Sequence, residues 1–482
     1  MNIVQLQIQG ELAPARSGAT FQRCNPITRE VVTTAAAAAP EDAVAAVVAA
    51  ERAFPAWART GPAERRAMLT KAADELERDL PTLVATMMSE TGASELWAGF
   101  NAVTAVGILR EAAALTTQIN GEIIPSDLPG NLALAVRQPA GVSLGIAPWN
   151  APLILGVRAI AVPLACGNTV ILKASEACPA THRRIVDAFS RAGVAPGVVN
   201  FVSHAPADAG PVVDAMISHP AVRRVNFTGS TRVGKIIAVK CAEHLKPVVL
   251  ELGGKAPLVV LDDADLDQAV DGAIFGAFLN SGQICMSTER IIVDESIADE
   301  FAERLARKAR SLTPGPAGSG AALGSVIDMA TVDRCNMLLD DALAAGARLL
   351  CGGRADGTLM VPTLLDHVAL GMKIYGEESF GPIKGIVRVK GLEEAVRCAN
   401  DNEYGLSAAV YGRDIARAMQ VAQRIESGIC HINGPTVHDE PQMPFGGVKA
   451  SGVGRFGGRS GIDAFTDLRW LTVQTSARHY PF

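Results

Sequence analysis

The sequence predicts an α/β protein with two large domains, and three observations support this prediction. The chain has 482 residues, which is more than a single hydrophobic core usually accommodates. Short apolar runs alternate with longer helical segments through the middle of the chain, a pattern typical of βαβ units and a mainly parallel sheet. The same alternation begins again near Pro257, which predicts a second α/β region.

The elements of the first region are expected in a simple order along the chain. A proline at the start, acidic residues in the first turn and valines at helical spacing predict an amphipathic helix at 40–54. A second helical stretch is expected over roughly 63–91. Apolar runs then predict the strands of the first sheet, at 142–147, 169–173, 198–202, 222–227 and 248–252.

The second region is expected to begin with a strand at 257–261. Acidic residues at 262–267 suit the start of a helix that reaches about residue 280, and the proline- and glycine-rich stretch 313–320 is expected to be a loop. The tail 464–475 alternates like a strand, and segment 118–138 separates the first helices from the sheet. Both segments are candidates for packing against another subunit or for edge strands of the same chain.

The composition and charge exclude several classes of protein. Hydrophobic residues make up 49% of the chain and charged residues 20%, so a disordered chain is not expected. The net charge of −6, from 44 basic and 50 acidic residues, argues against a nucleic acid partner. The N-terminus lacks the pattern of a secretory signal, and the most apolar stretch contains Arg158 and Pro163, which argues against a membrane span. We therefore expect a soluble, cytoplasmic protein with no nucleic acid or membrane partner.

The nine cysteines include no Cys-x-x-Cys pair, so no metal site is expected. A reducing compartment fits this cysteine usage, because most thiols there behave as small buried hydrophobic side chains. At most one of the nine needs to be reactive.

Two motifs at the ends of predicted strands suggest a nucleotide site, because the carboxyl edge of such a sheet binds ligands. Gly229-Ser-Thr-Arg-Val-Gly234 opens a helix whose amides could hold a phosphate, although it is no Walker A loop, since Ile236 follows Lys235. Lys173-Ala-Ser-Glu176 places a lysine and a carboxylate where they could hold ribose hydroxyls. The alternatives are a strand-to-helix turn that needs glycine and a solvated helix entrance in which Glu176 matches the helix dipole.

Three further motifs carry side chains suited to acyl transfer. Glu251 in Glu251-Leu-Gly-Gly-Lys255 ends a predicted strand and could act as a general base in an apolar crevice. Cys285 lies just past a predicted helix, and as a nucleophile it would need a nearby base or positive field. Asn150 in Pro148-Trp149-Asn150 could donate a hydrogen bond to an oxyanion. The alternatives are an ion pair of Glu251 with Lys255, a buried structural cysteine and a helix-capping asparagine.

In their order and spacing these motifs resemble the aldehyde dehydrogenase superfamily, from about Asn25 to Trp470. The resemblance implies Cys285 as the nucleophile, Glu251 as the general base, and Asn150 with the backbone amide of Cys285 as oxyanion donors. The stretch 443–449, followed by Ser451-Gly, matches the family's C-terminal signature. The resemblance also implies an NAD site, with NADP possible, whose expected residues are Trp149, Lys173, Glu176, Gly229, Ser230, Glu378 and Phe380.

The implied architecture is a Rossmann-type NAD-binding domain at 1–117 and 139–250, a second α/β catalytic domain at 251–449, and a small β oligomerisation element at 118–138 and 464–482. That element implies a homodimer or homotetramer. One departure from the family matters. Many relatives carry a glutamate after the arginine that corresponds to Arg455, whereas this chain has Phe456. A second carboxylate for proton relay is therefore absent, and deacylation is expected to depend on Glu251.

The implied activity is the oxidation of an aldehyde to its carboxylic acid. The Cys285 thiolate would attack the aldehyde, and hydride transfer to the nicotinamide would leave a thioester. Glu251 would then activate the water that releases the acid. Because Glu176 would repel a 2′-phosphate, NAD is expected to be preferred over NADP.

The expected substrate is an aromatic aldehyde. Helical spacing after Asn150 and the neighbours of Cys285 predict the pocket wall, formed by Ile154, Leu155, Arg158, Ile284 and Met286. An apolar wall with one guanidinium suits a ring that bears a polar substituent. The block at 431–440 also resembles the subgroup that acts on benzaldehyde-type substrates, such as the salicylaldehyde and vanillin dehydrogenases. The alternative is a semialdehyde or aliphatic aldehyde, with Arg158 as a packing or salt-bridge residue.

Two other classes of protein fit less well. A cysteine hydrolase would also use a thiolate and a base, but it would not need the motifs at 173–176 and 229–234. A non-catalytic binding member of the fold would be expected to lose Cys285 or Glu251, and both are present.

Overall fold

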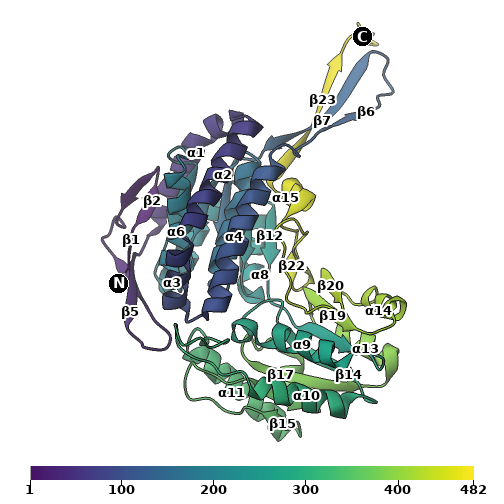
Figure 1. Ribbon diagram of the computed structural model, residues 1–482. Helices are drawn as coiled ribbons and strands as arrows, with labels where there is room; N and C mark the ends of the chain where they lie inside the picture. The colour runs from purple at the N-terminus through teal and green to yellow at the C-terminus, as the bar shows by residue number, and fades with distance from the viewer. Residues whose placement is uncertain (1) are drawn as a thin grey trace.

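Two large sheets and a projecting β arm make up the computed structural model, which describes residues 2–482 (Figure 1). The first sheet has the strand order β22-β12-β11-β8-β9-β10-β2-β3. Its five central strands are parallel, namely β8 (Val142–Ile146), β9 (Thr169–Lys173), β10 (Val199–Val202), β11 (Val222–Thr228) and β12 (Val248–Glu251). The edges are antiparallel, with β22 (Gly452–Val453) at one side and β2 (Leu6–Ile8) and β3 (Glu11–Ala13) at the other.

This strand order makes a doubly wound sheet. The chain places β9 and β10 on one side of β8 and then returns to place β11 and β12 on the other side. In such sheets the ligand crevice lies outside the carboxyl ends of the strands where the winding reverses, which is here between β8 and β11.

Helices cover both faces of the first sheet. One face carries α1 (Pro40–Arg59), α7 (Ala209–Ser218) and α8 (Thr231–Glu243). The other carries α5 (Pro152–Ala165) and α6 (Pro179–Arg191), and these helices are covered by a further layer of α2 (Pro62–Arg78), α3 (Leu80–Thr91) and α4 (Glu95–Leu115). The predicted stretch 63–91 is thus two helices, because Pro81 has no amide hydrogen to continue the first one.

The second sheet has the order β15-β16-β17-β14-β13-β19-β20, and its strand pairs are parallel except for β15 with β16. Its strands are β13 (Ala256–Val260), β14 (Thr288–Asp294), β15 (Arg348–Cys351), β16 (Thr363–Asp366), β17 (Ile383–Val389), β19 (Ser407–Tyr411) and β20 (Ile429–Ile432). Helices α9 (Leu266–Phe278) and α10 (Ala298–Arg310) pack on one face. The other face is covered by α11 (Met329–Ala344), α13 (Gly391–Asn400) and α14 (Ile415–Ala422). The predicted α/β class with parallel sheets is confirmed.

The arm is a three-stranded sheet that extends away from both large sheets (Figure 1). It contains β6 (Glu122–Ile124), β7 (Asn131–Pro139) and β23 (Thr466–Gln474), and β23 pairs with β7 along its whole length. The strand predicted in the tail is therefore confirmed. The domain boundaries given above stay a prediction.

The remaining elements are short. They are β1 (Asn2–Val4), β4 (Thr20–Cys24), β5 (Val31–Ala36), β18 (Tyr404–Gly405), β21 (Val448–Lys449), α12 (Lys373–Gly376), α15 (Gly458–Phe465), and the 3₁₀ turns η1 (Pro206–Asp208) and η2 (Leu279–Gly282). Within residues 2–482 no helix combines the length and the apolar character needed to cross a membrane.

A buried ion cluster ties two strands of the second sheet, β14 and β17, and the residue before β13 to one loop. Glu289 on β14 receives the ammonium of Lys255 at 2.8 Å and that of Lys384 at 2.6 Å, and all three side chains are at most 2% exposed. Ser379 adds its backbone amide and its hydroxyl to the same carboxylate. Burial alone would raise the pKa of Glu289, but the two lysines bring it down to about 2. The cluster therefore fixes the loop next to Ser379, which contains Glu378 and Phe380.

Glu289→Gln is expected to destabilise the folded protein by about 3–5 kcal/mol, because it leaves two buried ammonium groups without a counter-charge. Thermal unfolding followed by circular dichroism should show a clear fall in Tm. The control is Glu303→Gln, which removes an exposed partner of Arg307 and should leave Tm nearly unchanged. A Glu289→Gln variant that unfolds at the wild-type temperature would contradict the role given to this cluster.

Candidate active site

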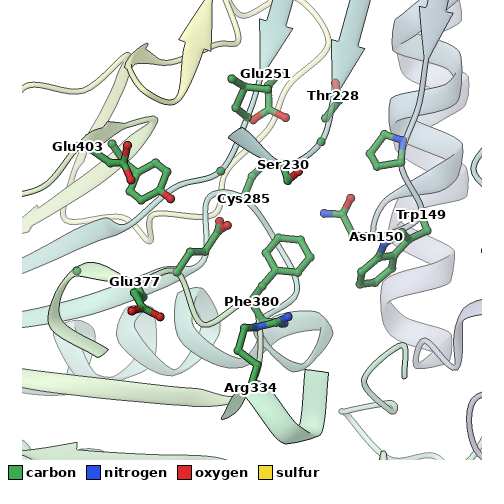
Figure 2. A pocket seen from close by; sticks show the side chains of 17 residues that line it. Trp149, Asn150, Thr228, Ser230, Glu251, Cys285, Arg334, Glu377, Phe380 and Glu403 are labelled. Atoms are coloured by element: carbon green, nitrogen blue, oxygen red, sulfur yellow. The ribbon is translucent and has the colours of Figure 1, made fainter. Parts of the chain in front are cut away.

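A cleft of about 450 Å³ opens at the carboxyl ends of β8, β11 and β12, at the reversal point of the first sheet. The second sheet's lobe closes its other side. Figure 2 places Cys285 between Glu251 and Phe380, with Asn150 on a third side of the cleft. The lining residues are Pro148, Trp149, Asn150, Thr228, Gly229, Ser230, Glu251, Leu252, Gly253, Cys285, Arg334, Gly376, Glu377, Glu378, Phe380, Glu403 and Tyr404.

One end of the cleft is the N-terminus of α8. Ser230 caps this helix by accepting a hydrogen bond from the amide of Val233. Glycine is needed next to it, because a Cβ at Gly229 would lie 2.4 Å from the ring of Phe227. A helix N-terminus that points into a cleft supplies amide donors and a positive field, which fit the pyrophosphate of a dinucleotide.

Two predicted cofactor residues lie one strand further along the same sheet edge. Lys173 is the last residue of β9 and is 7% exposed, and Glu176 follows in the turn before α6. Burial lowers the pKa of Lys173, while the charge of Glu176 opposes that change. Lys173 and Glu176 do not line the cleft itself, whereas Trp149, Gly229, Ser230, Glu378 and Phe380 do.

A second cavity of about 360 Å³ lies on the other side of Cys285 and is mainly apolar. All five residues of the predicted pocket wall line it, namely Ile154, Leu155, Arg158, Ile284 and Met286. Sequence reasoning missed its other walls, which are Trp97, Phe100, Ala151, Phe275, Leu279, Pro435, Val437, His438, Asp439 and Phe445. For Phe100 a signal existed, since Leu96, Phe100 and Val103 repeat at helical spacing and form an apolar face of α4 that is 41–63% exposed.

Cys285 and Asn150 line both cavities. The cleft and the second cavity, called the apolar tunnel from here on, therefore meet at these two side chains. Asn150 donates its side-chain amide to the carbonyl of Gln283 at 3.1 Å. The backbone carbonyl of Asn150 accepts hydrogen bonds from the side chains of Trp97 at 2.9 Å and Asn280 at 3.1 Å. The N-cap of α5 is Ala151, so the alternative of a helix-capping asparagine does not apply.

The loop that carries Cys285 is held in an unusual backbone conformation. Asn280 and Ser281 have positive φ angles of 50° and 53°. Gln283 fixes the loop, because its side chain donates to the carbonyls of Asn280 and Ser325 and accepts from the amide of Ile327. A strained backbone of this kind persists only where surrounding contacts hold it in place. Here it places the Cys285 thiol at the junction of the two cavities.

Glu251 ends β12 next to this loop and is 1% exposed. Among residues 2–482, neither of its carboxylate oxygens has a hydrogen-bond partner. Burial raises the pKa of Glu251 to about 8, although the Cys285 thiol and the charge of Arg158 oppose this rise. The alternative of an ion pair with Lys255 is wrong, because Lys255 pairs with Glu289.

The surroundings of Cys285 favour its protonated form. Burial raises its pKa well above the usual value, and the charges of Glu251 and Glu378 act in the same direction. The Cys285 thiol and the Glu251 carboxyl therefore lie close enough to shift each other's pKa. The glycines after Glu251 permit their approach, since a Cβ at Gly254 would lie 2.3 Å from the carbonyl oxygen of Cys285.

Glu378 and Phe380 close the cleft from the second lobe. Glu378 accepts a hydrogen bond from the amide of Gly254 at 2.8 Å, and burial raises its pKa to about 7. Phe380 meets the ring of Trp149 edge-on, with 5.7 Å between the ring centres. Arg334, which sequence reasoning missed, supports this loop by donating to the carbonyl of Ser379 at 2.9 Å. The aromatic pair and Glu378 fit the nicotinamide end of a dinucleotide.

Phe456 stands where a second carboxylate occurs in many relatives. Its side chain is 1% exposed, and its ring centre lies 6.4 Å from that of Phe465. Its backbone forms a bridge with Phe445. The Phe456 side chain is therefore part of the apolar core and cannot carry a proton. The carboxylates whose charge reaches Glu251 are instead Glu378 and Asp439.

Comparison with known proteins agrees with this geometry. The aldehyde dehydrogenase family model matches residues 13–471. A vanillin dehydrogenase from Pseudomonas fluorescens is 58% identical over 479 residues, which cover 99% of this chain and 99% of the relative. The crystal structure of a salicylaldehyde dehydrogenase from Pseudomonas putida G7, complexed with salicylaldehyde, is 49% identical, covers 100% of both chains and has a TM-score of 0.98. Betaine aldehyde dehydrogenase from Staphylococcus aureus, solved with NAD⁺, is 31% identical with a TM-score of 0.94, over 98% of this chain and 95% of that one. The chain therefore belongs to the aldehyde dehydrogenase family.

Proposed function

We propose that this enzyme oxidises an aromatic aldehyde to its carboxylic acid through a thioester on Cys285. The observation that carries the proposal is the position of Cys285 and Asn150, which line both the dinucleotide cleft and the apolar tunnel. An aldehyde in the tunnel would thus present its carbonyl carbon to the sulfur and its oxygen to two donors, the Asn150 amide and the backbone N–H of Cys285.

Cys285, Glu251 and the oxyanion donors have separate roles in the reaction. Glu251 accepts the proton of the Cys285 thiol as the sulfur bonds to the carbonyl carbon, and the donors hold the oxyanion that forms. A bound nicotinamide supplies the acceptor for the hydride that leaves this carbon. Glu251 then releases the thiol proton to solvent. Water attacks the thioester, Glu251 takes the proton from that water, and the C–S bond breaks to release the acid and return the sulfur as a thiolate.

Members of this family use a nicotinamide cofactor, and we propose that this enzyme prefers NAD over NADP. Ser230 and the α8 N-terminus would hold the pyrophosphate, and Glu378 with Phe380 the nicotinamide end. Lys173 and Glu176 would hold the adenine ribose, and the carboxylate of Glu176 would repel a 2′-phosphate.

The tunnel supports an aromatic substrate. Its walls include Trp97, Phe100 and Phe445. One of its polar residues is Arg158, whose guanidinium stacks on Phe445 at 4.4 Å. Nη2 of Arg158 donates hydrogen bonds to Asp439. The other N–H groups of the guanidinium could donate to a hydroxyl on the substrate ring. The similar proteins named above act on vanillin and salicylaldehyde, which are both hydroxylated benzaldehydes.

We also propose a cytoplasmic homodimer or homotetramer in which the arm packs against another subunit. In support, Ile123 on β6 and Trp470 on β23 are each 75% exposed, and Leu468 is 61% exposed. Apolar side chains gathered on a projecting sheet are expected to be covered in the assembled protein.

The preference for one class of aldehyde and for one cofactor can be measured directly. The kcat/KM for vanillin and salicylaldehyde is expected to exceed that for succinate semialdehyde and for an aliphatic aldehyde by about tenfold or more, because the tunnel buries an aromatic ring. Initial rates of NADH formation test this, with NADP in a parallel series expected to give lower values. A clear preference for the semialdehyde or the aliphatic aldehyde would contradict the aromatic substrate, and a higher kcat/KM with NADP would contradict the cofactor preference.

The raised pKa of Glu251 makes the rate of thioester hydrolysis depend on pH. The rate of thioester hydrolysis should rise with pH through a midpoint near 8, because Glu251 must lose its proton before it can accept one from water. Glu251→Gln should lower kcat by about 10²–10⁴-fold and remove this acidic limb, whereas Glu303→Gln should keep it. Stopped-flow and steady-state rates between pH 6 and about 9.5 provide the measurement, and an unchanged limb in Glu251→Gln would reject Glu251 as the base.

A further inference from the structure

A third cavity, of about 290 Å³, lies beside the apolar tunnel and is called the side chamber from here on. Its walls are formed by β20, by the residue before that strand, and by the segment 438–445 that follows it. Three residues of this segment, His438, Asp439 and Phe445, line the tunnel as well. The tunnel and the side chamber therefore adjoin along an edge made by these three residues.

Contacts on both sides hold this edge in place. Asp439 accepts two hydrogen bonds from Nη2 of Arg158, both at 2.7 Å, and the same guanidinium lies 4.4 Å from the ring centre of Phe445. Nε2 of His438 lies 2.8 Å from Oε1 of Glu440. The side chain of Asp439 is 7% exposed, whereas that of His438 is 49% exposed. Asp439 is thus the inner end of the edge, and His438 is its end at the surface.

The side chamber contains an unpaired polar atom among apolar side chains. His431 on β20 meets the ring of His438 edge-on, with 5.1 Å between the ring centres. Nε2 of His431 is buried and has no hydrogen-bond partner among residues 2–482. Burial and, to a smaller degree, the charge of His438 lower the pKa of His431, so this imidazole is neutral near pH 7. Ile429, Met443 and Pro444 supply apolar surface around it.

The charges of the lining indicate which ligands fit. Asp439 and Glu440 both line the side chamber, and its lining among residues 2–482 includes no lysine or arginine. A negatively charged group would therefore meet like charges there. A neutral group with a carbon chain and one polar atom suits the apolar surface and the unpaired nitrogen of His431.

We propose that the side chamber is a subsite of the aldehyde site and takes a neutral alkoxy or hydroxyalkyl substituent of the aromatic ring. The proposal rests on the aromatic aldehyde activity proposed above. The ring would lie in the apolar tunnel with its carbonyl at Cys285, and the substituent would extend past His438 into the side chamber. Nε2 of His431 would then gain the hydrogen-bond partner that it lacks.

The test compares kcat/KM for benzaldehyde with that for meta- and para-isobutoxybenzaldehyde. The wild-type enzyme should oxidise at least one isobutoxy isomer with a kcat/KM within about tenfold of that for benzaldehyde. Met443→Trp and Ile429→Phe, which narrow the side chamber from its two walls, should lower kcat/KM for this isomer about tenfold more than for benzaldehyde. Met419→Trp on α14 is the matched control, because Met419 is 46% exposed, Met443 is 45% exposed, and Met419 lines neither cavity. It should leave the ratio of the two values unchanged.

A second comparison tests the charge of the substituent. Carboxymethoxybenzaldehyde has the shape of the isobutoxy compound but a negative charge, so its wild-type kcat/KM should be about tenfold lower or less. Equal values for the charged and the neutral compound would overturn the assignment to neutral substituents.

Two further outcomes would overturn the subsite while the aromatic activity stands. One is a wild-type enzyme that oxidises benzaldehyde but neither isobutoxy isomer, and the other is an unchanged ratio of the two kcat/KM values in both Met443→Trp and Ile429→Phe. A wild-type enzyme that oxidises neither benzaldehyde nor vanillin would instead reject the aromatic activity itself, and the subsite with it.

Discussion

Two cations near the buried carboxylate of Glu251, one in the chain and one by its charge, are each paired with a different acid. Lys255, four residues along the chain, is bound by Glu289, and Arg158 is bound by Asp439. Glu251 is left without a hydrogen-bond partner among the described residues, and burial therefore raises its pKa into the range where it can take and release protons.

The fold brings this carboxylate and the thiol together from separate sheets. Glu251 belongs to the last parallel strand of the first sheet, and Cys285 precedes β14 in the second. Gly254 allows the segment after β12 to approach the Cys285 loop, and Gly253 allows it to approach Glu378. The ion cluster at Glu289 fixes the opposite wall. Because the first sheet reverses its winding at β8 and β11, the dinucleotide cleft opens beside the same thiol.

Sequence reasoning predicted what short-range patterns encode. The apolar runs of the two sheets lie where strands occur, and the motifs at 148–150, 229–234, 251–255 and 285 follow strands or loops whose ends meet in one cleft. It missed contacts between residues far apart in the chain, such as Lys255 with Glu289 and Arg158 with Asp439, because any lysine, arginine or acid can pair in many ways. It also placed one long helix where Pro81 divides two, since a proline near a helix start and one that ends a helix look alike in a sequence.

The most direct measurement is the mass of the enzyme trapped during turnover. Glu251→Gln has lost the base for both steps, so it should form the thioester slowly and hydrolyse it more slowly still. After prolonged incubation with NAD and vanillin its mass should increase by that of one vanilloyl group in place of a proton. Peptide mapping should place the group on Cys285. An acyl group on any other residue, or none while NADH forms at the stoichiometry of one per enzyme, would contradict the account.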